Sequence, residues 1–157
     1  MPQRQRIAHV RLDEATLVRR RPEVDHERAV AIYDLLEENH FAPVGGFTGP
    51  YDLHLRLEGN RLVLDIRSQA GDPLLEVPLP LRSFQSLVKD YFLVCESYYA
   101  SIKKSSPSHI EAIDMGRRGL HDEGAEMLRE RLAGKVDIDF DTARRLFTLI
   151  CVLHIRG

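Results

Sequence analysis

The sequence has no tryptophan and only two cysteines among its 157 residues. Cys95 and Cys151 lie in apolar patterns of helical spacing without a metal-type arrangement, so we expect two buried thiols. No apolar run reaches the length of a membrane span, and no apolar signal core follows the opening residues. These absences exclude a membrane-spanning chain and predict a cytoplasmic protein.

An excess of one charge is also lacking, because the net charge is −2. This balance gives the chain no overall attraction to nucleic acid or to anionic lipid. Residues 1–21 are a local exception with six arginines against two acids, and a second basic pair stands at Lys103-Lys104. Nucleic-acid binding stays open as an alternative, but stacking platforms interleave basic and aromatic residues on one surface, and these clusters are separate.

Familiar catalytic and cofactor signatures are missing as well. The sequence has no Gly-x-Ser-x-Gly elbow, no phosphate-loop motif, no dinucleotide fingerprint and no His-Glu-x-x-His zinc motif. It therefore identifies no catalytic residue and no cofactor, although a triad assembled by long-range folding stays open.

What the sequence does have is an apolar segment near its C-terminus, residues 146–155. Its side chains would cover nearly the whole circumference of a helix. At about 1.5 Å per residue, this helix would be half as long as a bilayer span. We therefore expect a helix that is buried inside the protein and capped at its start by Asp141.

Alternating apolar residues predict the strands. Residues 53–57 and 62–66 alternate on either side of a Gly-Asn pair, which predicts a hairpin with a tight turn. Residues 74–79 predict a third strand, which its prolines place at an edge. Residues 6–12 predict a strand whose inner face begins with Ala8, and Val136 to Phe140 is expected to be extended.

Helical spacing and capping residues predict the helices. Asp25 is expected to begin a helix whose inner face carries Val30, Tyr33, Leu35 and Leu36. Ser83 is expected to begin a long second helix.

A capping box at Ser108 is expected to open the next helix. Gly116 and Gly119 are expected to break or kink that helix, with a further helix following them.

Strands that precede most of the helices are typical of the α+β class. We expect one domain over residues 1–157, with a small antiparallel sheet of about three to four strands. A helical layer that includes the buried C-terminal helix is expected to cover one face of the sheet.

Two arginine pairs form a candidate anion site. Arg117 and Arg118 stand between two glycines, and Arg144 and Arg145 lie in the first turn of the C-terminal helix. Guanidinium groups bind phosphate or carboxylate in bidentate fashion. The alternative is that the arginines pair with acids of this chain. A shared empty cleft would favour the anion site, and intervening acids would favour the structural network.

Three residues form a second candidate, a metal site. Asp137 and Asp139 share one face of the extended segment, and His121 is a possible third ligand. This arrangement would support a metal-assisted hydrolase, but the sequence contains no calcium-loop motif.

Several segments resemble those of a known protein family. They are residues 37–43, 89–92, 95–99, 113–121 and 140–147. The chain resembles an uncharacterised family of alphaproteobacterial proteins over essentially its whole length. The resemblance implies a bacterial cytosolic protein of this size and carries over neither an activity nor functional residues.

These observations favour a non-enzymatic interaction or regulatory protein that binds a protein partner or forms a homodimer. The helices contain many apolar residues, and the sequence shows no recognisable set of catalytic residues. The arginine pairs are suited to binding an acidic partner. The alternative is an anion-binding protein for a nucleotide, a phosphate metabolite or RNA.

Overall fold

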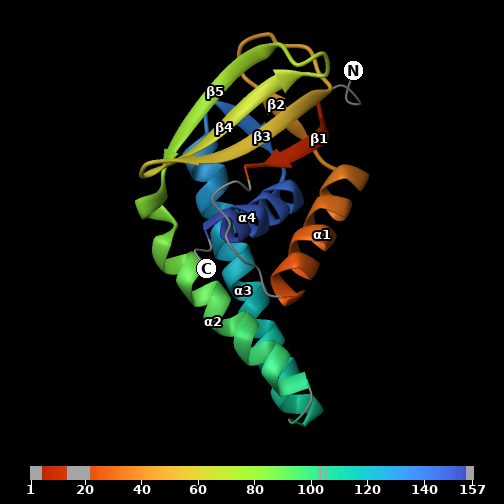
Figure 1. Cartoon of the computed structure of the whole chain (residues 1–157), viewed down its shortest axis with the longest axis vertical. Coiled ribbons are helices and arrows are strands. Elements are labelled where there is room, and N and C mark those ends of the chain that lie inside the picture. Colours follow the sequence, from red (N-terminus) through yellow and green to blue (C-terminus); the bar gives the residue numbers. More distant parts are fainter. Residues whose placement is uncertain (1–4, 14–21, 103, 105, 155–157) are drawn as a thin grey trace.

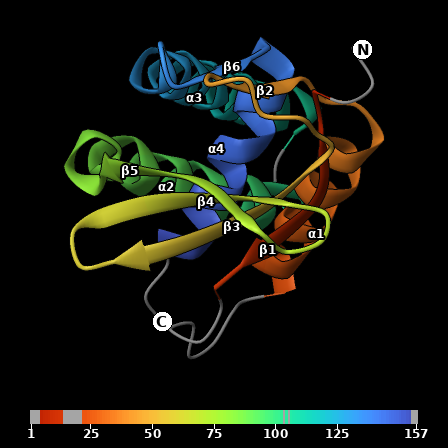
Figure 2. The same ribbon diagram turned by 90° about the horizontal axis from the view of Figure 1, so that it is seen from above.

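The computed structural model describes residues 5–13, 22–102, 104 and 106–154, and it confirms the α+β class. Figures 1 and 2 show the main sheet on one side of a layer of helices. In chain order the elements are β1 (Ile7–Leu12), α1 (Pro22–Glu37), β2 (Phe41–Pro43), β3 (Tyr51–Glu58), β4 (Arg61–Ser68), β5 (Pro73–Pro80), the 3-10 turn η3 (Leu81–Ser83), α2 (Gln85–Ile102), α3 (Pro107–Leu132), β6 (Val136–Ile138) and α4 (Phe140–His154).

The predicted hairpin is confirmed as β3 and β4. These strands pair antiparallel up to Glu58 and Arg61. Gly59 in the turn has a φ of +62°, a left-handed conformation that glycine adopts without steric cost. β5 pairs with β4 and forms one edge of the sheet, as its prolines predict.

The first strand differs from its prediction in two ways. The sheet order is β1-β3-β4-β5, and β1 runs parallel to β3, so the sheet is mixed rather than wholly antiparallel. A parallel neighbour needs a crossover, and α1 lies in that connection. The register also slips between Ile7 and His9. The extra residue of this bulge places Ile7 in the core, where simple alternation predicts Ala8.

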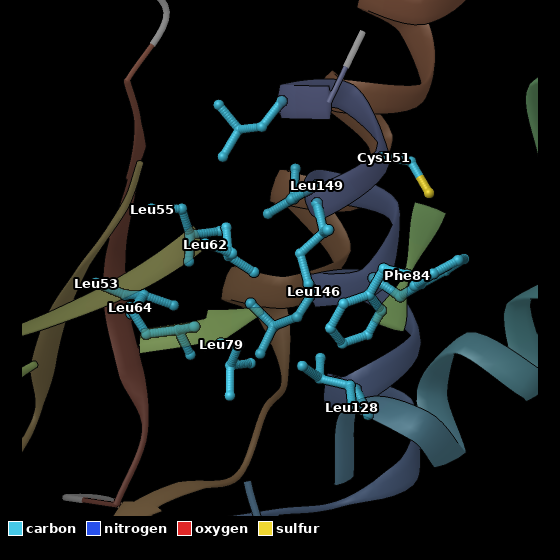
Figure 3. Packing of buried hydrophobic residues seen from close by; sticks show 14 of the residues in the cluster. Leu53, Leu55, Leu62, Leu64, Leu79, Phe84, Leu128, Leu146, Leu149 and Cys151 are labelled. Carbon is cyan, nitrogen blue, oxygen red and sulfur yellow. The ribbon is translucent and has the colours of Figure 1, made fainter. Parts of the chain in front are cut away.

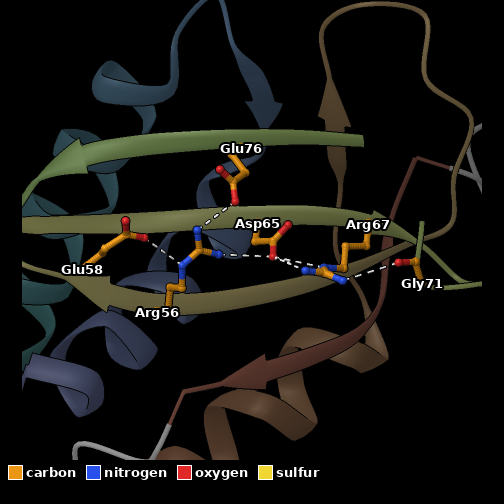
Figure 4. Close-up of polar contacts among 6 residues, drawn as sticks. All are labelled: Arg56, Glu58, Asp65, Arg67, Gly71 and Glu76. Atoms are coloured by element: carbon orange, nitrogen blue, oxygen red, sulfur yellow. Dashed lines mark hydrogen bonds and ion pairs between the residues drawn. The ribbon is translucent and has the colours of Figure 1, made fainter. Parts of the chain in front are cut away.

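The outer face of the sheet carries a group of paired charges, which we call the sheet network (Figure 4). Arg56 contacts Glu58 at 3.1 Å, Asp65 at 3.2 Å and Glu76 at 2.8 Å. Arg67 contacts the same Asp65 at 2.9 Å, and Asp65 is only 3% exposed. Opposite charges thus pair across the strands of the sheet.

The C-terminal helix α4 is the buried centre of the molecule, as predicted. Leu146 and Leu149 point from α4 toward leucines of β3, β4 and β5, while Cys151 lies on the other side of the helix (Figure 3). α4 also packs against the other helices. Both thiols are buried, and burial raises the pKa of Cys95 to about 11. None of the helices in the described residues combines the length and apolar character needed to cross a bilayer.

The predicted break in the third helix is wrong. α3 runs without interruption through Gly116 and Gly119, because the packing of its flanking turns outweighs the low helix propensity of glycine. Its cap also lies earlier than predicted. The side chain of Ser106, not Ser108, accepts a hydrogen bond from the His109 N–H at 3.3 Å.

Two further predicted helix starts are wrong. α4 begins at Phe140, and Asp139 caps it by accepting the Thr142 N–H at 2.9 Å. Asp141 therefore lies inside the first turn. Ser83 lies in the 3-10 turn η3, and α2 begins only at Gln85.

The predicted inner face of the first helix is confirmed only in part. Leu35 is buried and Leu36 packs against the core, as expected, but the other two predicted residues are exposed. α1 begins before Asp25, and it buries Ala31 and Leu35 against its neighbours. Val30 and Tyr33 are 42% and 66% exposed. The contacts of α1 with α4 and β1 select a narrower stripe than the apolar residues of its sequence suggest.

A short second sheet joins β2 to β6, antiparallel. Asn39 connects this region to the main sheet, because its side chain accepts the Ile7 N–H at 2.7 Å and donates to the Ile7 carbonyl at 3.0 Å. It also donates to the Leu35 carbonyl at the end of α1.

Candidate ligand-binding cleft between the helices

All four helices line one cavity of about 540 Å³, which we call the helix cleft. Its size is that of a small-molecule site. It is lined by His26, Glu27, Val30, Ala31, Asp34, Tyr98, Tyr99, Ile102, Arg117, Arg118, His121, Asp141, Arg144, Arg145 and Thr148. All four arginines of the predicted anion site are among these residues, so the two pairs share one cleft.

The α1 wall of the cleft comes from a single helical stripe. Val30 and Ala31 each lie three or four residues from both Glu27 and Asp34, so these side chains share one face of the helix. This stripe presents an acid at each end and apolar side chains between them.

Glu27 is the centre of a hydrogen-bonded cluster at one end of the cleft. It accepts from the Tyr99 hydroxyl at 2.9 Å, from Tyr91 at 3.4 Å and from Arg117 at 2.9 Å. Burial and the hydrogen bond to Glu27 raise the pKa of Tyr99. Arg117 also binds Asp114 at 2.8 Å. The Glu27 carboxylate is therefore fully engaged by residues of this chain.

Two aromatic side chains that line the cleft also help to hold Arg117 in place. Its guanidinium stacks on the Tyr98 ring at 4.6 Å, and Tyr98 packs edge-on against Tyr99. Arg118, the next residue, is more exposed and pairs with Asp114 at 3.0 Å. The first arginine pair is thus tied to carboxylates.

The second arginine pair is less completely matched. Arg144 Nε lies 3.2 Å from an Asp122 carboxylate oxygen, but this buried N–H has no hydrogen-bond acceptor in the described part of the chain. Arg145 donates to the backbone carbonyl of Glu38 at 3.3 Å. Buried donors are nearly always satisfied in proteins, so Arg144 is matched in charge by Asp122 but incompletely in hydrogen bonding, and its side chain remains partly exposed.

His121 lies on the floor of the cleft as a neutral side chain. Its ring packs against Tyr91 at 4.9 Å, and its Nε2 lies 3.1 Å from the Thr148 hydroxyl. Burial, together with the charge of Arg144, lowers its pKa to about 4. Thr148 donates to the Arg144 carbonyl at 3.2 Å, so the His121 Nε2 has to supply the proton of their shared hydrogen bond.

The residues of the predicted metal site do not come together. His121 lines the helix cleft, Asp139 caps α4, and Asp137 pairs with His40 at 3.2 Å and lines a second cavity beside β6. Within the described ranges, no group of three potential ligands is placed to hold a metal ion. A metal-assisted hydrolase built on this triad therefore has no geometric support.

Sequence reasoning missed Glu27 and its tyrosine partners. A signal was present, because Tyr91 and Tyr99 lie two turns apart on one helical face and buried tyrosine hydroxyls require partners. Arg19–Arg21 and Lys103, which belong to the predicted basic clusters, lie outside the described residues.

Comparison with known proteins decides the family. Residues 4–156 match the model of the Uncharacterised protein family (UPF0262). The chain belongs to this family. It is 69% identical to the UPF0262 protein of Paramagnetospirillum magneticum, over the full length of both chains. It is 64% identical to the UPF0262 protein of Rhodospirillum rubrum, over 96% of this chain and 93% of the relative.

A third relative, from Azorhizobium caulinodans, is 59% identical over 99% of this chain and 98% of its own. No solved structure matches the chain. The resemblance to an alphaproteobacterial family is confirmed. The family has no assigned activity, so the function has to be argued from the cleft itself.

Proposed function

We propose that this chain is a cytoplasmic, single-domain binding protein that holds a small organic anion in the helix cleft. The observation that carries the proposal is the incomplete pairing of two neighbouring arginines in a cavity of about 540 Å³. Among the described residues, Arg145 binds only a backbone carbonyl, and Arg144 lies beside Asp122 without a hydrogen bond on its Nε. We assign it a non-enzymatic, regulatory role, in which ligand binding stabilises the arrangement of the helices around the cleft.

We assign different roles to the two arginine pairs of the helix cleft. Arg117 is held by Glu27 and Asp114, so its charge is already matched. It supports the wall, and Arg118 adds positive charge at the rim. Arg145, which has no carboxylate partner in the described residues, and Arg144, which has only the more exposed Asp122, are assigned to the ligand. Guanidinium groups suit a carboxylate or a phosphate, since both present two acceptor oxygens.

Thermal unfolding tests the proposal with phosphate and simple carboxylates as probes at constant ionic strength. A ligand that binds only the folded state raises Tm, by about 2–4 °C for each kcal/mol in a protein of this size. The double variant Arg144→Gln and Arg145→Gln should lose the shift.

The matched control is Arg82→Gln with Arg131→Gln, which removes the same charge from exposed positions outside the cleft. It should keep the shift. No shift in the native protein, or an equal shift in the cleft variant, would contradict the proposal.

A second candidate, binding of a protein partner or a second copy, is favoured by exposed apolar side chains. Tyr33 and Met115 are both 66% exposed. Figure 1 shows the end of α2 and the start of α3 projecting beyond the other helices. The double variant Tyr33→Ser and Met115→Ser should convert a dimer to a monomer in light scattering. A native protein that is monomeric at every concentration would exclude the homodimer.

A further inference from the structure

Two carboxylates share the arginine end of the helix cleft. Arg145 binds the Glu38 carbonyl, and Asp34 lies one turn before Glu38 on α1. Asp141 lies one turn before Arg145 on α4. Among the described residues, neither Asp34 nor Asp141 forms an ion pair or a side-chain hydrogen bond, although Asp141 and Arg145 have the spacing for one. Both signs of charge are therefore available at this end.

Apolar side chains lie next to these charges. Val30 is one turn from Asp34 on the same face of α1, and Ile102 comes from the end of α2. They are 42% and 48% exposed. Exposure of large aliphatic side chains to water is unfavourable in free energy, and a ligand with an apolar part would cover them.

Three simple ligand classes fit this set of groups poorly. A pure anion would lie next to Asp34 and Asp141, a pure cation would lie next to Arg144 and Arg145, and a neutral apolar molecule would leave charges of both signs without a partner. A zwitterion with an apolar side chain matches all three features at once.

We infer that the ligand is an α-amino acid with an aliphatic side chain. This inference rests on the proposed function and specifies its ligand. The carboxylate binds Arg144 and Arg145, the ammonium group binds Asp34 and Asp141, and the side chain lies against Val30 and Ile102. No bond is made or broken, because the site binds the amino acid and releases it unchanged.

Four compounds, each tested for its effect on thermal unfolding, distinguish the contributions of the ligand's carboxylate, ammonium group and side chain. Leucine carries all three features, N-acetyl-leucine lacks the ammonium, 3-methylbutylamine lacks the carboxylate, and glycine lacks the side chain. We expect leucine at millimolar concentration to raise Tm by about 2–4 °C, and each analogue by less than half as much.

The outcomes distinguish this inference from the proposed function. If N-acetyl-leucine stabilises as well as leucine and the Arg144→Gln, Arg145→Gln variant abolishes both shifts, the zwitterion is wrong and the anion site stands. If neither these compounds nor phosphate shifts Tm, both are wrong. If the amine stabilises as well as leucine, the role of the arginines is wrong.

A charge variant supplies the second test, by calorimetric titration. Asp34→Asn should weaken leucine binding about ten- to hundredfold, because it removes a charge-assisted contact to the ammonium. It should leave the weaker binding of N-acetyl-leucine unchanged or improved. The control Asp90→Asn removes an exposed carboxylate of α2 outside the cleft and should change neither affinity. Equal leucine affinities for the two variants would overturn the inference, and unchanged Tm values without ligand would show that both fold.

Discussion

The sheet network and the helix cleft are both rich in arginine, but they differ in how completely their charges are matched. In the sheet network, Arg56 contacts three carboxylates, and Asp65 is closed off between Arg56 and Arg67. Every charged side chain in it has a partner of opposite sign. Such a cluster holds strands in register and leaves nothing for a ligand.

The helix cleft has matched and unmatched charges side by side. Its Glu27 end is as fully paired as the sheet network. At the other end, Arg145, Asp34 and Asp141 have no side-chain partner in the described residues, and Arg144 has an ion pair with Asp122 but no hydrogen bond on its Nε. The comparison of the two regions shows that a high arginine content does not by itself identify a binding site. Incomplete pairing inside a cavity is the more specific sign.

The largest effect is expected from breaking the sheet network at its buried acid. Asp65→Ala would leave Arg56 and Arg67 without their shared partner at a site that is 3% exposed. Removing one partner of a buried ion pair costs about 3–5 kcal/mol, and the partial exposure of both arginines places the loss near the lower value. Urea unfolding measures it. A loss below about 1 kcal/mol would show that the network contributes little.

The second-largest effect is expected on the pH dependence of the free energy of unfolding, through His121 in the helix cleft. His121 has a pKa of about 4 when folded, against an ordinary value of 6.5. Between these values the unfolded chain binds more protons, so the free energy of unfolding falls as pH falls from 6.5 to 4. The loss attributable to His121 is about 3 kcal/mol.

The variant His121→Gln isolates this contribution, because glutamine can still donate to Thr148 but does not titrate. Its unfolding free energy should depend less on pH between 4 and 6.5 than that of the native protein. Parallel pH profiles for the two proteins would contradict the burial of a neutral histidine.

A smaller effect is expected where α3 meets α4, the contact that positions His121 and Arg144. A Cβ atom on Gly124 would overlap the Phe147 ring. Gly124→Ala should therefore destabilise the protein by about 1–3 kcal/mol through overpacking. Gly116→Ala on the same helix meets open space, and it should stabilise by up to about 1 kcal/mol. Destabilisation of similar size by both variants would disprove the close approach.

The smallest effect on stability should come from the cleft's least matched arginine. Arg145→Gln removes only a hydrogen bond to the Glu38 carbonyl at an exposed position, so the unfolding free energy should change by less than about 0.5 kcal/mol. Ligand-dependent stabilisation should nevertheless fall. A large loss of stability without ligand would show that Arg145 is a structural residue like those of the sheet network.

Local patterns predicted the parts of the fold that depend on neighbouring residues. The hairpin follows from alternation around the turn at Gly59, and the burial of α4 follows from its apolar circumference. The parallel placement of β1 and the bulge after Ile7 depend on contacts with β3, which local alternation does not encode. Gly116 and Gly119 do not interrupt α3, because tertiary packing outweighs their low helix propensity.

The candidate site was predictable only in part. The four arginines of the candidate anion site line one cleft, an arrangement that the sequence left open, and their binding of an anion stays a prediction. Glu27 was missed, since its partners come from α2 and α3, far along the chain. The metal triad did not assemble, because Asp139 is used as a helix cap and Asp137 faces a different cavity from His121.

The most direct test of the unmatched cleft charges is a nuclear magnetic resonance titration of the arginine Nε–H groups with leucine. The Arg144 and Arg145 signals should shift in a saturable manner with one shared dissociation constant, while those of Arg56 and Arg67 stay fixed. Unchanged signals from Arg144 and Arg145 at saturating leucine, or equal shifts in the sheet network, would contradict the account.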